Sequence, residues 1–230
     1  MSVVAVVVAG GSGVRMGGSV RKQYLLLGGM PLMGHCLRTL DESSEVESMV
    51  LVVPEEDMED IQVRILPKFG LKKKLVLAKG GASRQASVFS GLASVDPKAS
   101  YILVHDAVRP FLEPHHIRDG LDAAKKYGAA SLSTEIVDTL RSKFPHSGSA
   151  GPDRDSLLAV QTPQIFRSDL LRRAHEHSLA TGCMETDDAG LVAALGYPVV
   201  YIQGSRTNLK VTSPEDRILA EALYRVIQGN

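Results

Sequence analysis

The sequence predicts an α/β fold built on a Rossmann-like, doubly wound and mostly parallel sheet, with a β-hairpin arm protruding from it. Residues 3–9 read VVAVVVA, an apolar run typical of a strand that is buried on both faces of a helix-covered sheet. Short apolar runs and helix-like segments then alternate along the chain, as they do in doubly wound folds. The alternation stops between about residues 135 and 154, where serine, glycine and proline are frequent.

The predicted strands are short apolar runs such as MVLVV and YILV. In chain order they cover residues 3–9, 49–53, 75–78, 101–104, part of 157–166, and 197–202. The predicted helices cover residues 31–40, 55–66, 83–94, 114–127, 168–180, 187–195 and 214–227. Pro214 follows Thr212 and Ser213, an order typical of a helix start, because proline suits the first turn and a hydroxyl side chain caps it.

The stretch that interrupts the alternation includes Pro145, Gly148, Gly151 and Pro152. It is too polar for a core and too long for an ordinary loop, and long loops in compact domains are usually functional or disordered. We expect residues 1–230 to form one domain, and residues of about 135–157 to form an arm that reaches away from it.

Composition limits the classes of partner. The chain contains 26 Lys plus Arg and 26 Asp plus Glu, so its formal net charge is zero. A zero total excludes a broadly basic nucleic-acid coat and an acidic disordered tail, although it allows cations to gather in one cleft.

Cysteine content and hydropathy point to the compartment. Cys36 and Cys183 are too few and too far apart for a disulfide framework or a zinc motif. The apolar run at residues 3–9 is too short for a membrane span or a signal-peptide core. We therefore expect a cytoplasmic protein that binds neither nucleic acid nor membrane.

A glycine-rich loop, AGGSGVRMG, follows the first predicted strand. Its glycines allow backbone N–H groups to approach a phosphate, although such a loop can also be a simple tight turn. A P-loop would need Gly-Lys-Ser/Thr, and a dinucleotide fingerprint would need an acidic residue after the second strand, where Pro54 stands. Arg15 and Lys22 can fold over a polyphosphate and neutralise charge that develops on it, unless both are solvated surface charges.

The segment VHDAVRP ends the predicted strand YILV. Ligands of open α/β sheets bind at the carboxyl ends of strands. Asp106 is therefore placed to hold Mg²⁺, which prefers hard oxygen ligands such as a carboxylate and phosphate oxygens. We expect His105 to be a core histidine, or to support a neighbouring ligand, rather than to bind metal.

A set of motifs runs in order along nearly the whole chain: AGGSGVRMG, KQY, GGASRQASVFSGL, VHDAVRP, VDT, DR at residues 153–154, QTPQIF, TDD and NLKVTSPED. Together they resemble the cytidylyltransferases of sugar and polyol phosphates. The resemblance is closest to the 2-C-methyl-D-erythritol 4-phosphate cytidylyltransferase family of isoprenoid biosynthesis. It implies a stand-alone enzyme that transfers a cytidylyl group from CTP to a polyol phosphate and releases pyrophosphate.

The resemblance also implies roles for individual residues. The nucleotide would contact Ala9, Gly10, Gly11, Gly13, Gly80, Gly81, Ser87 and Asp106. Of these, Gly80, Gly81 and Ser87 would read the cytosine, and Asp106 would serve the ribose or Mg²⁺. The transition state would be stabilised by Arg15 and Lys22, and the attacking phosphate would be positioned by Arg154 and Lys210. The polyol phosphate would contact Arg109, Thr139, Thr162 and Thr186. The arm would join two subunits into a homodimer and complete the neighbour's site.

The identity of the acceptor has two readings. The Ala-Gly-Gly and Asp-Ala-Val-Arg-Pro forms of two motifs look more like ribitol 5-phosphate cytidylyltransferases. The Thr-Asp-Asp and Ser-Pro-Glu-Asp forms of two others favour the erythritol enzymes. A nucleotide-binding regulator without catalysis is a less favoured alternative, because Arg15, Lys22, Asp106 and Lys210 are all present, and a redox Rossmann protein is less favoured still.

Overall fold

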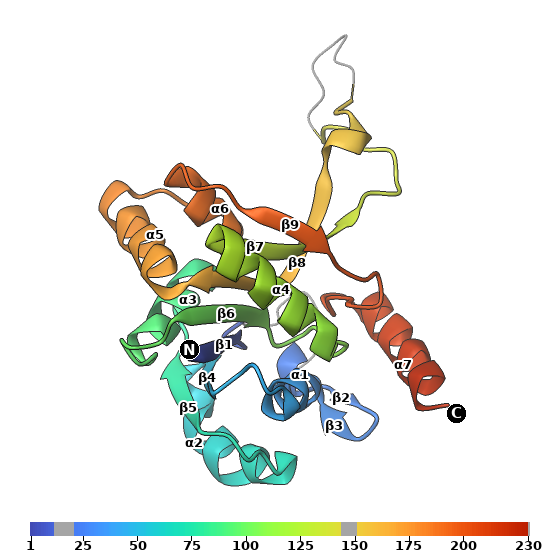
Figure 1. The fold of residues 1–230 in the computed structure, drawn as a ribbon. Coiled ribbons are helices and arrows are strands. Elements are labelled where there is room, and N and C mark those ends of the chain that lie inside the picture. The colour runs from blue at the N-terminus through green and yellow to red at the C-terminus, as the bar shows by residue number, and fades with distance from the viewer. Residues whose placement is uncertain (12–20, 144–150, 230) are drawn as a thin grey trace.

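The fold centres on a seven-stranded mixed sheet in a computed structural model that describes residues 1–11, 21–143 and 151–229. Its strands lie in the order β5-β4-β1-β6-β8-β7-β9 (Figure 1). Their bounds are β1 Val3–Val8, β4 Ser48–Val53, β5 Leu75–Lys79, β6 Tyr101–Asp106, β7 Ala129–Glu135, β8 Leu158–Arg167 and β9 Val200–Gln203. The first four are mutually parallel, β8 runs antiparallel to both β6 and β7, and β9 is parallel to β7. The predicted α/β class and mostly parallel sheet are confirmed.

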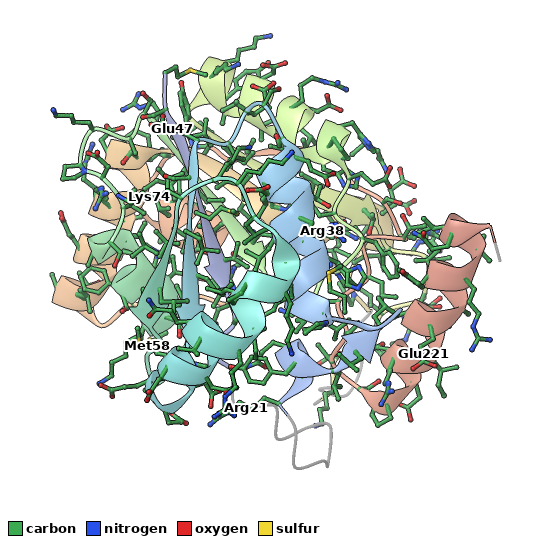
Figure 2. All side chains as sticks on the ribbon, turned by 90° about the horizontal axis from the view of Figure 1, so that it is seen from below. Arg21, Arg38, Glu47, Met58, Lys74 and Glu221 are labelled. Carbon is green, nitrogen blue, oxygen red and sulfur yellow. The ribbon has the colours of Figure 1, made fainter. Side chains whose placement is uncertain are left out.

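Both faces of the sheet are buried, because side chains alternate along each strand. In β1, Val3, Ala5 and Val7 pack in one core cluster, and Val4 and Val6 pack in another. On the first face lie α1 (Leu32–Glu42), α4 (Pro114–Tyr127) and a helical segment at residues 55–69. On the second face lie α3 (Arg84–Ala93), α5 (Ser168–Thr181) and α6 (Asp188–Ala194). Figure 2 shows α1 and the segment that carries Met58 covering the first face. The apolar run read from the sequence is therefore a central strand.

The helical segment at residues 55–69 changes its winding along its length. It consists of η3 (Glu55–Asp57), α2 (Met58–Asp60), a π-helical stretch η4 (Ile61–Ile65) and η5 (Leu66–Phe69). The helix predicted over residues 55–66 is thus present and extends three residues further.

The last helix, α7 (Pro214–Gln228), lies to one side of the sheet beside a small two-stranded sheet of β2 (Leu26–Leu27) and β3 (Met30–Pro31) (Figure 1). Ser213 caps α7 by accepting the backbone N–H of Asp216, with Pro214 in the first turn, as the sequence predicts. Among the described residues, no helix is both long and apolar enough to cross a lipid bilayer.

Strand β7 is the main element that the sequence interpretation missed. Its residues AASLSTE are small or polar and lack the apolar run of the other strands. The serines are nevertheless buried, since Ser131 donates to the backbone oxygen of Gln161 and Ser133 to that of Ile202. A serine whose hydroxyl is hydrogen-bonded to a neighbouring strand can occupy a core position where an apolar residue such as valine would otherwise be expected.

The arm continues the antiparallel pair β7–β8, which ends where Glu135 lies opposite Leu158. Beyond that pair, residues 136–143 and 151–157 contain the short helix η6 (Arg154–Ser156) and no strand. Figure 1 shows this segment projecting away from the body of the sheet. The paired strands of the predicted hairpin, β7 and β8, therefore lie within the sheet.

Candidate active site

Three loops at the carboxyl edge of the parallel strands surround a cavity of about 500 Å³. They follow β1, β5 and β6 and are joined by the segment that carries Lys210. Eight residues predicted from the sequence line this cavity: Ala9, Gly10, Gly11, Lys22, Gly81, Ser87, Asp106 and Lys210. The cavity lies at the carboxyl ends of the strands, where the sequence analysis expects a ligand to bind.

The loops after β1 and β5 approach each other closely at two glycines, Gly10 and Gly80. The backbone N–H of Ala9 donates to Val52 across 2.8 Å, and that of Gly80 donates to Val53 across 2.7 Å. A Cβ added to Gly10 would lie 3.3 Å from the Cα of Gly80, tighter than most such contacts. A side chain at Gly10 would therefore require the two loops that form the cavity wall to separate by a few tenths of an ångström.

Ser87 shapes the loop that contains Gly81. Its hydroxyl accepts the backbone N–H of Gly81 at 3.0 Å and donates to the backbone oxygen of Ser83 at 2.8 Å. A Cβ at Gly81 would lie 2.6 Å from the Cβ of Ala86 in α3, so this loop cannot accept a side chain there. The result is a narrow backbone-lined wall, consistent with the predicted role of these residues in reading a small base.

Asp106 is the buried centre of a cluster of charges. Its Oδ1 lies 3.1 Å from Nε of Arg84, and its Oδ2 lies 2.7 Å from Nζ of Lys210 and 3.7 Å from Nε of Arg109. Burial alone would raise the pKa of Asp106, but Arg84, Lys210 and Arg109 outweigh it and hold the pKa well below the usual carboxyl range. Asp106 is therefore an anion that orients three cations.

A chain of hydrogen bonds fixes the turn after β6. His105 Nε2 lies 3.3 Å from the backbone oxygen of Arg109, and His105 Nδ1 lies 3.1 Å from the hydroxyl of Thr162. That hydroxyl accepts the backbone N–H of Asp106 at 3.1 Å. Burial lowers the pKa of His105 to about 4, so the imidazole is neutral, donates from Nε2 and accepts at Nδ1. His105 is a core residue, as the sequence predicts, and through Thr162 it supports Asp106, which lines both cavities.

Asn208 anchors the segment that carries Lys210. Its side-chain amide donates to the backbone oxygen of Thr162 at 2.8 Å, and its backbone oxygen accepts Nη1 of Arg109 at 2.6 Å. The backbone N–H of Val211 donates to Val108 at 2.9 Å. Lys210 and Arg109, which are about a hundred residues apart in the chain, are thus held by one set of contacts.

A second, smaller cavity of about 160 Å³ lies against the first. Three residues predicted to contact the polyol phosphate line it: Arg109, Thr162 and Thr186. Arg84, Asp106 and Lys210 line both cavities, so this trio forms a shared wall. Two adjoining cavities with a charged wall between them suit two anionic substrates that must meet.

Two predicted residues, Thr139 and Arg154, belong to the arm. Arg154 donates to the backbone oxygen of Val137 at 3.1 Å, and Thr139 is exposed. Neither lines the two cavities described above. Gly13 and Arg15 lie outside the described residues, and Gly80 lies beside the first cavity through its contact with Gly10. The predicted roles of all these residues stay predictions.

The residues around Asp106 do not form a site for an ion held by the protein alone. Asp106 is the one carboxylate that lines the larger cavity within the described part of the chain. Both of its oxygens face cationic nitrogens. Mg²⁺ demands a near-octahedral shell of oxygens, and three cations compete with it for this carboxylate. A role for Asp106 as a metal ligand stays a prediction.

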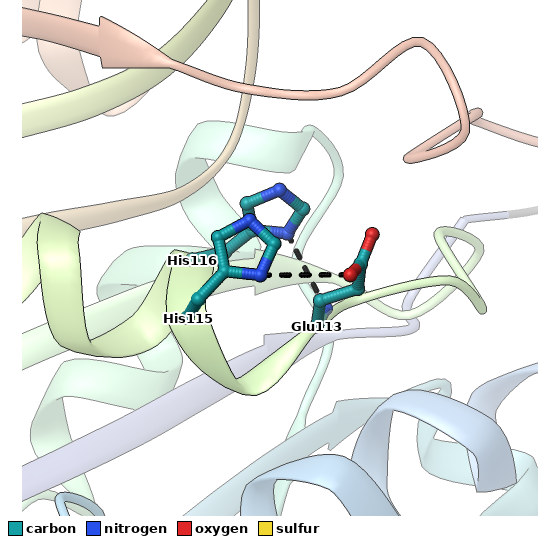
Figure 3. A group of neighbouring side chains, drawn as sticks. All are labelled: Glu113, His115 and His116. Atoms are coloured by element: carbon teal, nitrogen blue, oxygen red, sulfur yellow. Dashed lines mark hydrogen bonds and ion pairs between the residues drawn. The ribbon is translucent and has the colours of Figure 1, made fainter.

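Within the described residues, a separate group brings potential metal ligands within 4.8 Å of one another, namely Glu113, His115 and His116 (Figure 3). Its contacts are those of a helix start. Nδ1 of His116 accepts the backbone N–H of Glu113 at 3.3 Å, and Glu113 is the cap of α4. The carboxylate of Glu113 lies 3.5 Å from Nδ1 of His115. Because this group lines neither of the two cavities, it adds no ligand to the candidate site.

Comparison with known families decides the assignment. The family model for IspD, 2-C-methyl-D-erythritol 4-phosphate cytidylyltransferase, matches residues 3–226. The chain belongs to the IspD family. A curated IspD-family relative, the 2-C-methyl-D-erythritol 4-phosphate cytidylyltransferase of Pelotomaculum thermopropionicum, is 41% identical over 99% of this chain and 96% of its own length. The Bacillus velezensis protein of the same name is 40% identical over 100% and 99%.

Solved IspD-family structures share the fold. The 4-diphosphocytidyl-2C-methyl-D-erythritol synthase of Anaerococcus prevotii is 30% identical and superposes with a TM-score of 0.85, covering 99% of this chain and 96% of that one. The 2-C-methyl-D-erythritol 4-phosphate cytidylyltransferase of Thermus thermophilus is 34% identical with a TM-score of 0.78, covering 98% and 100%. Membership of the IspD family confirms the resemblance read from the motifs.

Several residues that build this IspD-family site were not selected from the sequence: Gln23, Arg84, Gln164, Asp188 and Asn208. Gln23, Arg84 and Gln164 line one or both cavities, whereas Asp188 and Asn208 hold neighbouring residues in place from outside them. Most of them stand inside or beside motifs already noted, such as KQY, TDD and NLK. Their position next to predicted residues was the available signal, but their hydrogen-bond partners lie far away in the chain.

Proposed function

We propose that this chain transfers a cytidylyl group from CTP to 2-C-methyl-D-erythritol 4-phosphate in the non-mevalonate isoprenoid pathway. The products are 4-diphosphocytidyl-2-C-methyl-D-erythritol and pyrophosphate. Membership of the IspD family supports this choice of acceptor over ribitol 5-phosphate. The structural observation that carries the proposal is the wall of Arg84, Asp106 and Lys210 between the two adjoining cavities.

The attacking group is a phosphate oxygen of the acceptor. A phosphate monoester has its second pKa near about 6, so it is largely a dianion at neutral pH and needs no general base. The difficulty is to bring this dianion against the α-phosphorus of CTP, because both partners are negatively charged. Cations that align and neutralise the two substrates are therefore the main requirement of catalysis.

Lys210 is suited to position the attacking phosphate, because it lines both cavities and its ammonium is held by Asp106. Lys22 lines only the larger cavity of the two, next to Gly10 and Gly11, where a triphosphate would lie. We assign Lys22, with Arg15, to the charge that builds on the phosphates in the transition state. Arg109 and Thr186 in the smaller cavity would contact the polyol phosphate.

Mg²⁺ enters this scheme as part of the substrate, carried by the phosphates of CTP. Bound there, it would neutralise phosphate charge and polarise the reacting phosphorus. The chain's own residues then bind and orient the complex. The reaction is assigned to the cytoplasm, where unpaired cysteines such as Cys36 and Cys183 stay reduced.

We also propose that two chains form a homodimer through the arm, and that Arg154 and Thr139 act in the partner's site. The support is that both residues lie on the projecting segment and outside the two cavities of their own chain. Three apolar residues at the base of the arm, Val137, Leu158 and Val160, are exposed and available to be covered. A chain that sediments as a monomer and is fully active would contradict the dimer.

Pyrophosphate release tests the activity directly. Purified chain and Mg²⁺ are incubated with CTP and either 2-C-methyl-D-erythritol 4-phosphate or ribitol 5-phosphate, with ATP in place of CTP as a control for the base. We expect turnover with the erythritol acceptor and CTP, and a kcat/KM lower by at least about 100-fold for the other pairs. Equal or better turnover with ribitol 5-phosphate would overturn the acceptor assignment.

A further inference from the structure

We propose that Arg84 is a positioning residue for this reaction, because it ties the Asp106 carboxylate at the shared wall to a rigid buried anchor, Asp188. The inference rests on the proposed function, since its consequence is measured on cytidylyl transfer. Arg84 stands in the first turn of α3. It contacts two acidic groups from different parts of the fold.

The guanidinium of Arg84 spans two carboxylates. Nε lies 3.1 Å from Oδ1 of Asp106, and Nη1 lies 2.7 Å from Oδ2 of Asp188. The remaining nitrogen, Nη2, is buried without a hydrogen-bond partner among the described residues. The two carboxylates therefore compensate for burying this cation, and its planar fork suits two partners at fixed angles.

Asp188 is a rigid anchor because its own contacts are complete. Its side chain is 1% exposed, and Oδ1 lies 2.9 Å from Nε2 of His175 in α5. Its backbone N–H donates to Oε1 of Gln164 at 3.1 Å, which ties the start of α6 to strand β8. Gln164 is itself fully buried and donates to Asp187 at 2.7 Å. Arg84 thus connects the site to α5, α6 and β8.

In the site, Arg84 determines which cations each carboxylate oxygen of Asp106 can contact. Arg84 takes up Oδ1, which leaves Oδ2 facing Lys210 and Arg109. Without Arg84, both oxygens of Asp106 are free to turn toward Lys210 and Arg109 and to compete with the acceptor phosphate for these cations. The expected loss therefore falls on use of the acceptor and on its alignment, and less on the affinity for CTP.

Four variants test this role: Arg84→Met, Arg84→Lys, Asp188→Asn and the control Arg172→Lys. Arg172 is also a partly buried arginine, and it donates to the backbone oxygens of Leu92 and Val95 at 2.9 and 3.0 Å, away from both cavities. Asp188 lines neither cavity, so Asp188→Asn weakens the anchor without removing a group from the site. Asp188→Asn also keeps the proposal testable if Arg84→Met fails to fold.

The measurements are kcat and KM for each substrate, the affinity for CTP by calorimetry, and the melting temperature. We expect Arg84→Met to lower kcat/KM for the acceptor by on the order of 10- to 100-fold, with CTP affinity within about threefold of wild type. Arg84→Lys should recover only part of the loss, since one ammonium cannot span both carboxylates. Asp188→Asn should shift the same constants in the same direction, and Arg172→Lys should leave them unchanged.

Three outcomes overturn the proposal. The first is that Arg84→Met and Asp188→Asn keep kcat/KM within about threefold at a temperature well below their melting points. The second is that Arg172→Lys causes an equal loss, and the third is that the loss lies in CTP affinity alone. An inactive wild-type chain would instead overturn the proposed function. The activity of the wild type alone therefore distinguishes that failure from a failure of the role given to Arg84.

Discussion

The side-chain amide of Gln23 donates a hydrogen bond to the backbone oxygen of Ala9 across 2.7 Å. Gln23 is 1% exposed, and it also reaches the backbone oxygen of Gly11 at 3.4 Å. These contacts join the loop after β1 to the turn η2 (Lys22–Tyr24), on either side of residues 12–20. The turn is further held by Tyr24, whose hydroxyl donates to Asp57 at 2.7 Å. Lys22 therefore stands on a turn that is fixed at two points.

Gln23→Glu should lower kcat by about tenfold or more, because a carboxylate cannot donate to the carbonyl of Ala9 and would displace the turn that carries Lys22. Steady-state kinetics with CTP and the acceptor measure the effect. Gln62→Glu on the exposed side of the helical segment 55–69 is the matched control and should be unchanged. Equal kinetics for Gln23→Glu and wild type would remove Gln23 from the positioning of the site.

Lys22→Ala should lower kcat by about 100-fold or more, since it removes a cation expected to act mainly in the transition state. Lys79→Ala is the control, because Lys79 is an exposed lysine at the end of β5 that pairs with Glu55. Its effect should stay within about twofold. If Lys22→Ala retained turnover within about threefold, its assignment to the transition state would be wrong.

The dependence on Mg²⁺ separates two roles for Asp106. If Asp106 mainly orients Lys210 and Arg109, Asp106→Asn lowers kcat but leaves the Mg²⁺ concentration for half-maximal rate unchanged. Removing Mg²⁺ with a chelator should stop turnover in wild type and variant alike, because the ion is expected to arrive with CTP. A variant whose rate is restored by excess Mg²⁺ would show instead that Asp106 is a ligand of the ion.

A mixed dimer tests whether the arm acts on the neighbouring site. Lys22→Ala and Arg154→Ala chains, each carrying a different affinity tag, are co-expressed and the heterodimer is purified. If Arg154 acts across the dimer, one of the two sites contains both native residues, and the heterodimer should recover about half of the wild-type activity. Heterodimer activity no higher than that of the two parent homodimers would place Arg154 in its own chain's site.

The stability of the chain should depend on the protonation of His105. Burial lowers the pKa of His105 from 6.5 to about 4, so the unfolded state binds more protons between these values. Stability from this group is therefore present above pH 6.5 and lost as the pH falls toward 4, with an upper limit of about 3 kcal/mol.

Denaturant titrations at several pH values measure this contribution. The stability difference between wild type and His105→Gln should shrink as the pH falls from 6.5 to 4. The exposed His177→Gln serves as a control and should show no such trend. A difference that stays constant over this range would contradict a neutral, buried His105 in the native state.

The sequence predicted the central strands because their burial leaves a direct mark, an unbroken apolar run in β1, β4 and β6. It missed β7 because Ser131 and Ser133 satisfy their hydroxyl groups within the sheet and so leave no apolar signal. The short pair β2–β3 was missed for a related reason, since two-residue strands carry too little pattern to be recognised.

The residues of the candidate site could likewise be predicted from the sequence only in part. Asp106 could be placed because it ends a strand, and ligands of open α/β sheets bind at the carboxyl ends of strands. Arg84 and Asp188 could not, because their contact joins residues 104 positions apart, in the first turns of two helices that both pack against α5. Local patterns in a single sequence do not encode which of many charged residues will meet across such a distance.

One carboxylate serves two cavities, and this has a thermodynamic consequence. A ligand in either cavity that draws Lys210 toward itself changes the pairing of Asp106 that the other ligand meets. The two binding equilibria are then linked, and linkage is reciprocal: CTP must change the dissociation constant of the acceptor by the same factor as the acceptor changes that of CTP. The sign and size of the coupling between the two substrates would then depend on a single ion pair, Lys210 with Asp106.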